Sequence, residues 1–141
     1  MNNTMSSSTT YNAHNIRTSL WRMWDPNLST MYILMWYPST ADESKNDKTI
    51  DRCISIAKSN NYGSITVYNL KSPLVSNPWE SFPIRGENLV IAWGAKITKE
   101  ESHRIVSQLS NKYNLYCFKK LKDGRPGLPT RLSKNTMVVL F

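Results

Sequence analysis

Residues 33–53 read ILMWYPSTADESKNDKTIDRC, and this stretch joins an apolar run to a Pro-Ser-Thr turn and then to an acidic segment. The apolar run over residues 31–36 is typical of a buried strand. Asp47 is a candidate N-cap of a following helix, and Gly63 is a candidate helix end. The apolar residues between them recur at helical spacing: Ile50, Cys53, Ile54 and Ala57. A polar turn that connects a buried strand to a helix is where α/β proteins usually place a ligand.

The whole chain has 141 residues, which is the length of one domain with a single core. Hydrophobic residues make up 40% of the chain. No apolar run approaches the roughly 18 residues needed to cross a bilayer. The segment 1–15 is polar and lacks an apolar h-region, so we expect a flexible tail there and no secretory signal. These features predict a single soluble, cytoplasmic domain over residues 16–141 that does not contact a membrane.

Cysteine and histidine are too sparse to indicate a metal site. Cys53 and Cys117 lie far apart and form no C-x-x-C pair, so we expect buried thiols in a reducing compartment. His14 and His103 are the two histidines of the chain, which makes a histidine-based site unexpected. The sequence therefore predicts neither a metal nor a cofactor.

The segments around the opening stretch alternate between strand and helix patterns. Residues 17–24 alternate partly with period two and precede the turn DPNLS, which predicts a β-hairpin leading into the strand at 31–36. A helix is predicted from Thr98, which forms a capping box with Glu101. Further strands are predicted at 64–70, 89–94 and 115–121, and residues 136–141 form either a final strand or an apolar tail. This alternation favours an α/β sheet with a parallel core, whereas residues 71–88 are too rich in Pro, Asn and Gly for a regular element.

Four short motifs each follow an apolar β-run: YPSTAD at 37–42, NL at 69–70, WG at 93–94 and LPTRLS at 128–133. The carboxyl edge of a parallel sheet would bring these motifs together. Each motif is weak by itself, because Pro-Ser-Thr turns, single asparagines and Trp-Gly bends also have purely structural roles.

Taken in order, the motifs resemble a known pattern. The signature PSTAD…D.TI.RCI..A…YGS..V.NL…GEN…AWG…K.G.P..P is similar to that of an uncharacterised bacterial and phage domain family, common in mobile elements, from Arg17 to the C-terminus. That family in turn resembles a compact, distant relative of the uracil-DNA glycosylase superfamily. In that superfamily a water-activating loop, a strand ending in Asn, a strand ending in Trp-Gly and a late His-Pro-Ser-Pro-Leu-Ser loop follow in the same order. The resemblance implies a three-layer α/β sandwich with a short, mainly parallel central sheet, preceded here by the N-terminal β-hairpin.

The resemblance also implies a role for one residue of several motifs. Tyr37 takes the water-activating position, and Asn69 takes the position that reads the edge of the flipped base. Leu128 replaces the histidine that stabilises the departing anion, and Leu132 corresponds to the leucine that fills the gap in the duplex. The implied base pocket comprises Tyr37, Pro38, Ser39, Asp42 and Asn69. Tyrosine is a poor base at neutral pH and leucine donates no hydrogen bond, so we expect a catalytically impaired, glycosylase-like binding protein.

The positive charge is concentrated in the last third of the chain. Residues 96–141 hold ten Lys/Arg against three Asp/Glu, whereas residues 1–95 hold eight against seven. This asymmetry predicts weak, salt-sensitive DNA binding, although a merely solvated basic surface is the simpler reading. The resemblance adds a second expected partner, an acidic inhibitor protein that mimics DNA. The predicted binding residues are Lys120, Lys122, Arg125, Arg131, Leu132 and Ser133.

Two other functions stay open. A working enzyme on a nucleotide or nucleobase could use Asp42 as a base beside Asn69. An interaction module without a pocket would use neither residue. The acids Glu43, Asp47 and Asp51 fit the first turns of a helix, where the helix dipole favours negative charge.

Overall fold

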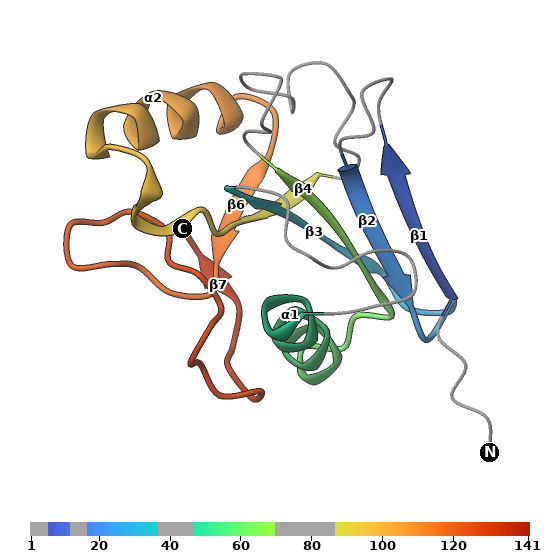
Figure 1. Ribbon diagram of the computed structural model, residues 1–141. Helices are drawn as coiled ribbons and strands as arrows, with labels where there is room; N and C mark the ends of the chain where they lie inside the picture. Colours follow the sequence, from blue (N-terminus) through green and yellow to red (C-terminus); the bar gives the residue numbers. More distant parts are fainter. Residues whose placement is uncertain (1–5, 12–16, 37–46, 70–86) are drawn as a thin grey trace.

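The computed structural model describes residues 6–11, 17–36, 47–69 and 87–141, and over these residues the chain folds around a seven-stranded sheet (Figure 1). The strand order is β1-β2-β4-β3-β5-β6-β7. The strands are β1 Ser6–Tyr11, β2 Arg17–Met23, β3 Thr30–Met35, β4 Ser64–Asn69, β5 Asn88–Ile91, β6 Asn114–Cys117 and β7 Val139–Leu140. The helices are α1 Lys48–Ser59, α2 Lys99–Leu109 and the short 3-10 helix η2 Gly94–Lys96.

The centre of the sheet is parallel. β3 pairs in parallel with β4 on one side and with β5 on the other, and β5 pairs in parallel with β6. β2 and β1 extend one edge in antiparallel fashion, and β7 extends the opposite edge in the same way. The predicted α/β sheet with a parallel core is confirmed.

The N-terminal part of the sheet differs from the prediction. We expected a tail over residues 1–15 and a hairpin in which residues 17–24 lead into β3. Instead, Ser6–Tyr11 forms the edge strand β1 and pairs with β2, while β2 pairs on its other side with β4. An edge strand needs no apolar face, so this Ser- and Thr-rich segment gives little hydrophobic signal, although Thr and Tyr favour strands.

The two longer helices cover opposite faces of the sheet (Figure 1). Successive residues of β3 point to opposite faces, as in any strand. Met31 and Ile33 belong to a buried group that includes residues of α1, here called the α1-side cluster. Leu34 and Trp93 belong to the α2-side cluster, which includes residues of α2. The chain therefore forms helix, sheet and helix layers with one apolar cluster on each side of the sheet.

Both helices begin at the N-caps predicted from the sequence. The Asp47 carboxylate accepts a hydrogen bond from the Ile50 amide at 2.9 Å. The Thr98 hydroxyl accepts one from the Glu101 amide at 3.1 Å. Such caps satisfy backbone donors that have no partner within the helix. Within the described residues, no helix has both the length and the apolar character needed to cross a membrane.

The end of α1 differs in detail from the prediction. The helix ends at Ser59, and the residue with left-handed backbone is Asn61 (φ 65°) rather than Gly63. Position 63 requires glycine because a larger residue would not fit: a Cβ atom there would lie 1.9 Å from the carbonyl oxygen of Asp25. The Trp24 amide donates to the Gly63 carbonyl at 2.9 Å. Glycine thus lets the segment before β4 pass close to the segment after β2.

Candidate functional site

The carboxyl edge of the parallel core brings together most of the motifs found in the sequence. β3 ends at Met35, β4 ends at Asn69, and Met35 and Asn69 are register partners. β5 leads into Trp93 and Gly94, beside which the 128–133 segment lies. The first motif follows directly after β3 but lies outside the described residues, together with four predicted pocket residues: Tyr37, Pro38, Ser39 and Asp42.

Asn69 has an unusual environment for a buried polar side chain. The exposed fraction of its side chain is 2%. Val67 and Ile65, two and four residues earlier in β4, belong to the α1-side cluster, so Asn69 points to the same face of the sheet. Neither atom of its amide group has a hydrogen-bond partner among the described residues. An unsatisfied buried polar group costs about 1–3 kcal/mol, so the Asn69 amide does not stabilise the fold through hydrogen bonds to the described residues. The amide presents one donor group and one acceptor at the end of a central strand.

Gly94 and Leu128 join the second half of the site. Gly94 has φ +72°, and a Cβ atom there would lie 3.0 Å from Cγ of Leu128. The Gly94 amide donates to the Pro126 carbonyl at 2.8 Å. Leu128 is half-buried and packs against the α1-side cluster. The predicted WG and LPTRLS motifs therefore lie in contact, and the position expected to stabilise a departing anion holds an apolar side chain.

The leucine expected to enter DNA is part of the core packing. Leu132 is half-buried and packs against the α1-side cluster. Its amide donates to the Pro129 carbonyl at 3.2 Å, which closes a tight turn. Within this turn Arg131 is exposed and has φ 66°, a backbone conformation that residues with a Cβ atom rarely adopt. Ser133 is exposed, and its hydroxyl accepts from the Asn135 amide at 3.1 Å.

Arg125 is a structural residue rather than a free cation. Its guanidinium lies 2.7 Å from the Asp123 carboxylate. It also donates to the Ile97 carbonyl at 2.7 Å and to the Ala95 carbonyl at 3.3 Å. The side-chain hydrogen bond from Arg125 lowers the pKa of the Asp123 carboxyl. Arg125 therefore holds its own loop against the segment after η2, and its charge is already compensated.

The predicted basic residues do not share one groove. Arg125 and Lys120 line a hollow of about 340 Å³ beside α2, where the Lys120 ammonium lies 4.7 Å from the ring centroid of Phe141. Arg131 lines a different groove beside α1, on the other face of the sheet. Lys122 is exposed near the tip of the loop that contains Asp123. The charge asymmetry of the sequence thus corresponds to two separate basic surfaces.

Sequence reasoning missed the residue that ties the C-terminal segment to α1. The Asn60 side-chain amide donates to the Thr136 carbonyl at 2.8 Å and accepts from the Val138 amide at 3.1 Å. The two partners lie more than 70 positions away in the sequence. Asn60 reads locally as an ordinary helix-end residue, so no local signal could have identified this contact.

Both thiols are buried, and burial disfavours their reactive thiolate form. Cys53 and Cys117 are buried, as predicted. Burial, with the nearby Asp47 charge as a second cause, raises the pKa of the Cys53 thiol to about 12. Burial also raises the pKa of Cys117. Because the thiolate is the nucleophile and the metal ligand, neither cysteine contributes such chemistry at neutral pH.

Fold and site together define an α/β domain with a parallel core and, at its carboxyl edge, a buried amide that has no partner among the described residues. A domain described as a protein of unknown function, DUF1643, is found at residues 17–82 of this chain. The matched region includes β2, β3, α1 and β4, and therefore Asn69. No curated protein and no solved structure matches the chain.

The contact between Gly94 and Leu128 gives a test of the site's architecture. Gly94→Ala combines left-handed strain with a close approach to Leu128. We expect it to lower the free energy of unfolding by about 3 kcal/mol. Gly124→Ala is the matched control, because Gly124 has φ +91° and open space around it, so strain alone should cost about 1 kcal/mol. Equal losses in urea unfolding would show that Leu128 does not pack on Gly94.

A second prediction concerns Leu132. Because this side chain packs against the α1-side cluster, Leu132→Ala should destabilise the protein by about 1–3 kcal/mol. Met137→Ala is the control, since Met137 is 67% exposed in the same C-terminal segment and should change stability by less than about 0.5 kcal/mol. If both variants unfold at the native midpoint, Leu132 is free to leave the core, as a DNA-inserting leucine must be.

Proposed function

We propose that this protein is a catalytically impaired, uracil-DNA glycosylase-like domain that binds a nucleic-acid base at the carboxyl edge of its sheet. The observation that carries this proposal is the buried, unpartnered amide of Asn69. A carboxamide held in this way can pair with a group that offers a donor and an acceptor side by side. The Watson-Crick edge of a pyrimidine such as uracil has this pattern.

The position of Asn69 favours recognition of a single base. β4 lies between β2 and β3, so the strand that carries Asn69 is paired on both sides. A hydrogen bond is electrostatically stronger where water is excluded, as it is around a side chain that is 2% exposed. The same exclusion makes an unmatched base costly, because the amide then stays unsatisfied. Asn69 can therefore discriminate between bases as well as bind one.

The sheet topology also supports the glycosylase-like reading. The parallel strands follow in the order β4-β3-β5-β6, with α1 and α2 on opposite faces. This arrangement places the NL and WG motifs at the same edge, as the resemblance requires. The late loop reaches that edge through the contact of Leu128 with Gly94.

The same contact argues for binding without base excision. A glycosylase needs a fixed donor for the negative charge that develops on the departing base. Leu128 has no donor, and its side chain is used in packing against Gly94 and the α1-side cluster. The enzymatic alternative depends on Asp42, which lies outside the described residues.

Nucleic acid fits the site better than a DNA-mimicking inhibitor protein. An inhibitor of that kind holds the loop leucine in an apolar pocket, which requires the leucine to be free. Leu132 instead packs against the α1-side cluster. Because a packed Leu132 also cannot fill a gap in a duplex, we place an unpaired nucleotide of a single strand first among the expected partners and the inhibitor second.

Replacing Asn69 by leucine tests the proposal directly. Asn69→Leu removes two unsatisfied polar atoms while keeping the volume, so we expect it to raise the free energy of unfolding by about 1 kcal/mol and the melting temperature by about 3 °C. The same substitution should remove any preference for an oligonucleotide with one deoxyuridine over the same strand with an abasic site, a loss of about tenfold. Fluorescence anisotropy and thermal unfolding provide the two measurements.

Asn60→Leu is the matched control, because the Asn60 amide makes hydrogen bonds at both of its atoms. This variant leaves the Thr136 carbonyl and the Val138 amide without partners and should lose about 2 kcal/mol of stability. The proposal fails if Asn69→Leu is destabilised as strongly as Asn60→Leu, or if it keeps the native preference for deoxyuridine.

The unmodified protein should not release uracil from DNA. Loss of one preorganised donor typically lowers a catalytic rate by about a hundredfold to a thousandfold, and Leu128 removes the donor from the anion position. A glycosylase assay on single-stranded DNA containing deoxyuridine checks this expectation. Uracil release that disappears in Asn69→Leu would contradict it and would favour the enzymatic alternative.

A further inference from the structure

A groove of about 550 Å³ lies between α1 and the 128–133 loop. Its lining residues are Lys48, Asp51, Arg52, Ser55, Thr130 and Arg131. The four helical positions are spaced by three and four residues, so they form one stripe on α1, away from the apolar face of that helix. The groove therefore has two walls, one from a regular helix and one from the loop that contacts Gly94.

The cations of this groove are not compensated in the way that Arg125 is. Among the described residues, Lys48, Arg52 and Arg131 form no ion pair. Among the described residues of the lining Asp51 is the one carboxylate, so these residues together carry an excess of positive charge. Arg125, by contrast, binds a carboxylate and two carbonyls. Unpaired guanidinium groups on facing walls are suited to hold the oxygens of a phosphate.

Arg131 occupies its position at a conformational cost. Its φ of 66° is unfavourable for any residue with a Cβ atom, yet the chain places an arginine there instead of glycine. The loop is fixed around it, since Leu128 and Leu132 pack into the α1-side cluster on both sides. Asn60 then ties the following segment to α1. The strained backbone thus presents the Arg131 side chain to α1 on a rigid support.

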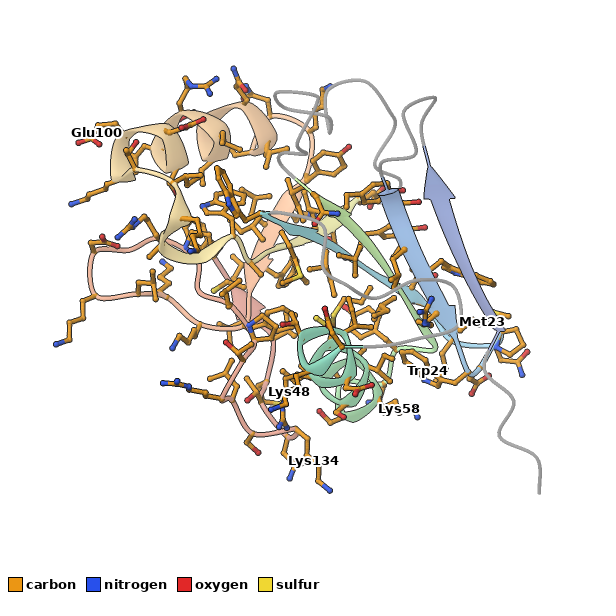
Figure 2. All side chains as sticks on the ribbon, viewed as in Figure 1. Met23, Trp24, Lys48, Lys58, Glu100 and Lys134 are labelled. Carbon is orange, nitrogen blue, oxygen red and sulfur yellow. The ribbon has the colours of Figure 1, made fainter. Side chains whose placement is uncertain are left out.

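We propose that this groove binds a backbone phosphate of the nucleic-acid strand whose base reaches Asn69, with Arg52 and Arg131 as the principal phosphate-binding residues. This inference rests on the proposed function and extends it from the base to the strand. Lys48 adds positive charge near the start of α1, where the helix dipole also favours an anion. Figure 2 shows Lys48 on α1 and Lys134 on the C-terminal segment at the same lower end of the molecule, while Glu100 lies on α2 at the opposite end.

Asp51 is expected to lower the affinity of the groove for a phosphate, which gives a test. Its carboxylate lines the groove and repels a phosphate there. Asp51→Asn should therefore bind a strand more tightly than the native protein, by about fivefold at low salt. Damage to the fold cannot produce this gain. Asp51→Asn binding no tighter than native protein would overturn the proposal.

The salt dependence of binding tests the two arginines. On a single-stranded oligonucleotide with one deoxyuridine, each contacted phosphate contributes roughly 0.7 to the slope of log K against log salt. Arg52→Gln and Arg131→Gln should each lower that slope by about 0.7. Arg104→Gln is the control, because Arg104 lies on α2 and pairs with Glu101. Slopes for the two groove variants equal to that of Arg104→Gln would also overturn the proposal.

Arg131→Gly separates binding from folding. This variant relieves the left-handed strain, so its melting temperature should rise while its salt slope falls as in Arg131→Gln. A free phosphate ion is distinguished from a strand by titrating inorganic phosphate and following its phosphorus resonance. Two results together would contradict the proposal: the protein is saturated by phosphate at millimolar concentration, and the groove variants keep the native salt slope for the strand. The groove would then be assigned to a free anion.

The Asn69 variant keeps this inference distinguishable from the proposed function. Asn69→Leu should lose the preference for deoxyuridine and retain the native salt slope, because it removes no charge. If Asn69→Leu keeps the native preference for deoxyuridine while the arginine variants have a lower salt slope, the proposed base site is wrong and the proposed phosphate groove is supported. If only Asn69→Leu changes binding, the groove fails and the base site stands.

Discussion

The parallel pairing of β3 between β4 and β5 is the constraint on which the rest of the structure depends. It directs the carboxyl ends of these strands to one edge and fixes Met35 opposite Asn69. Alternation along each strand then decides which cluster a side chain joins. A slip of one residue in β4 would move Asn69 from the α1 face to the α2 face. It would also turn every other side chain of β4 to the opposite face of the sheet. The same register that builds the two apolar clusters therefore places the unpaired amide.

Two features of the site lower the free energy of unfolding, and the packing of neighbouring residues holds both in place. The Asn69 amide is buried without a partner among the described residues, and Arg131 has a left-handed backbone. The paired strands around Asn69 and the half-buried leucines around Arg131, Leu128 and Leu132, hold these features in place. Local costs of this kind cluster at functional sites, which is why Asn69 and Arg131 carry the two proposals. Arg125 illustrates the contrast, because it lies in the same basic segment and binds the Asp123 carboxylate and the Ala95 and Ile97 carbonyls.

Much of the fold could be predicted from the sequence, because its signals are local. Asp47 and Thr98 act as the predicted N-caps, and the apolar runs became the central strands. The edge strand β1 could not be predicted, since a strand with no required apolar face has no apolar alternation. The pairing of β2 with β4 is also a non-local choice. In the site, the sequence indicated Asn69 and the Leu128 loop, but it could not tell that Arg125 is paired or that Arg52 and Arg131 line the same groove. Which charges meet is decided by the folded chain.

Under the proposed function, Leu128 occupies the position of a hydrogen-bond donor, and transition-state theory gives the effect on the rate. An amide that pairs with a base does so equally before and during cleavage of the glycosidic bond, so it lowers the energy of both states alike. Acceleration needs a contact that strengthens as negative charge develops on the base. Leu128 supplies apolar packing on Gly94 instead, which fixes the loop but does not respond to charge. Under the proposed function, a site that combines Asn69 with Leu128 retains affinity and specificity for a base while lacking catalytic rate. The interactions that we propose for this chain are therefore recognition of a base and, through the groove beside α1, of the strand that carries it.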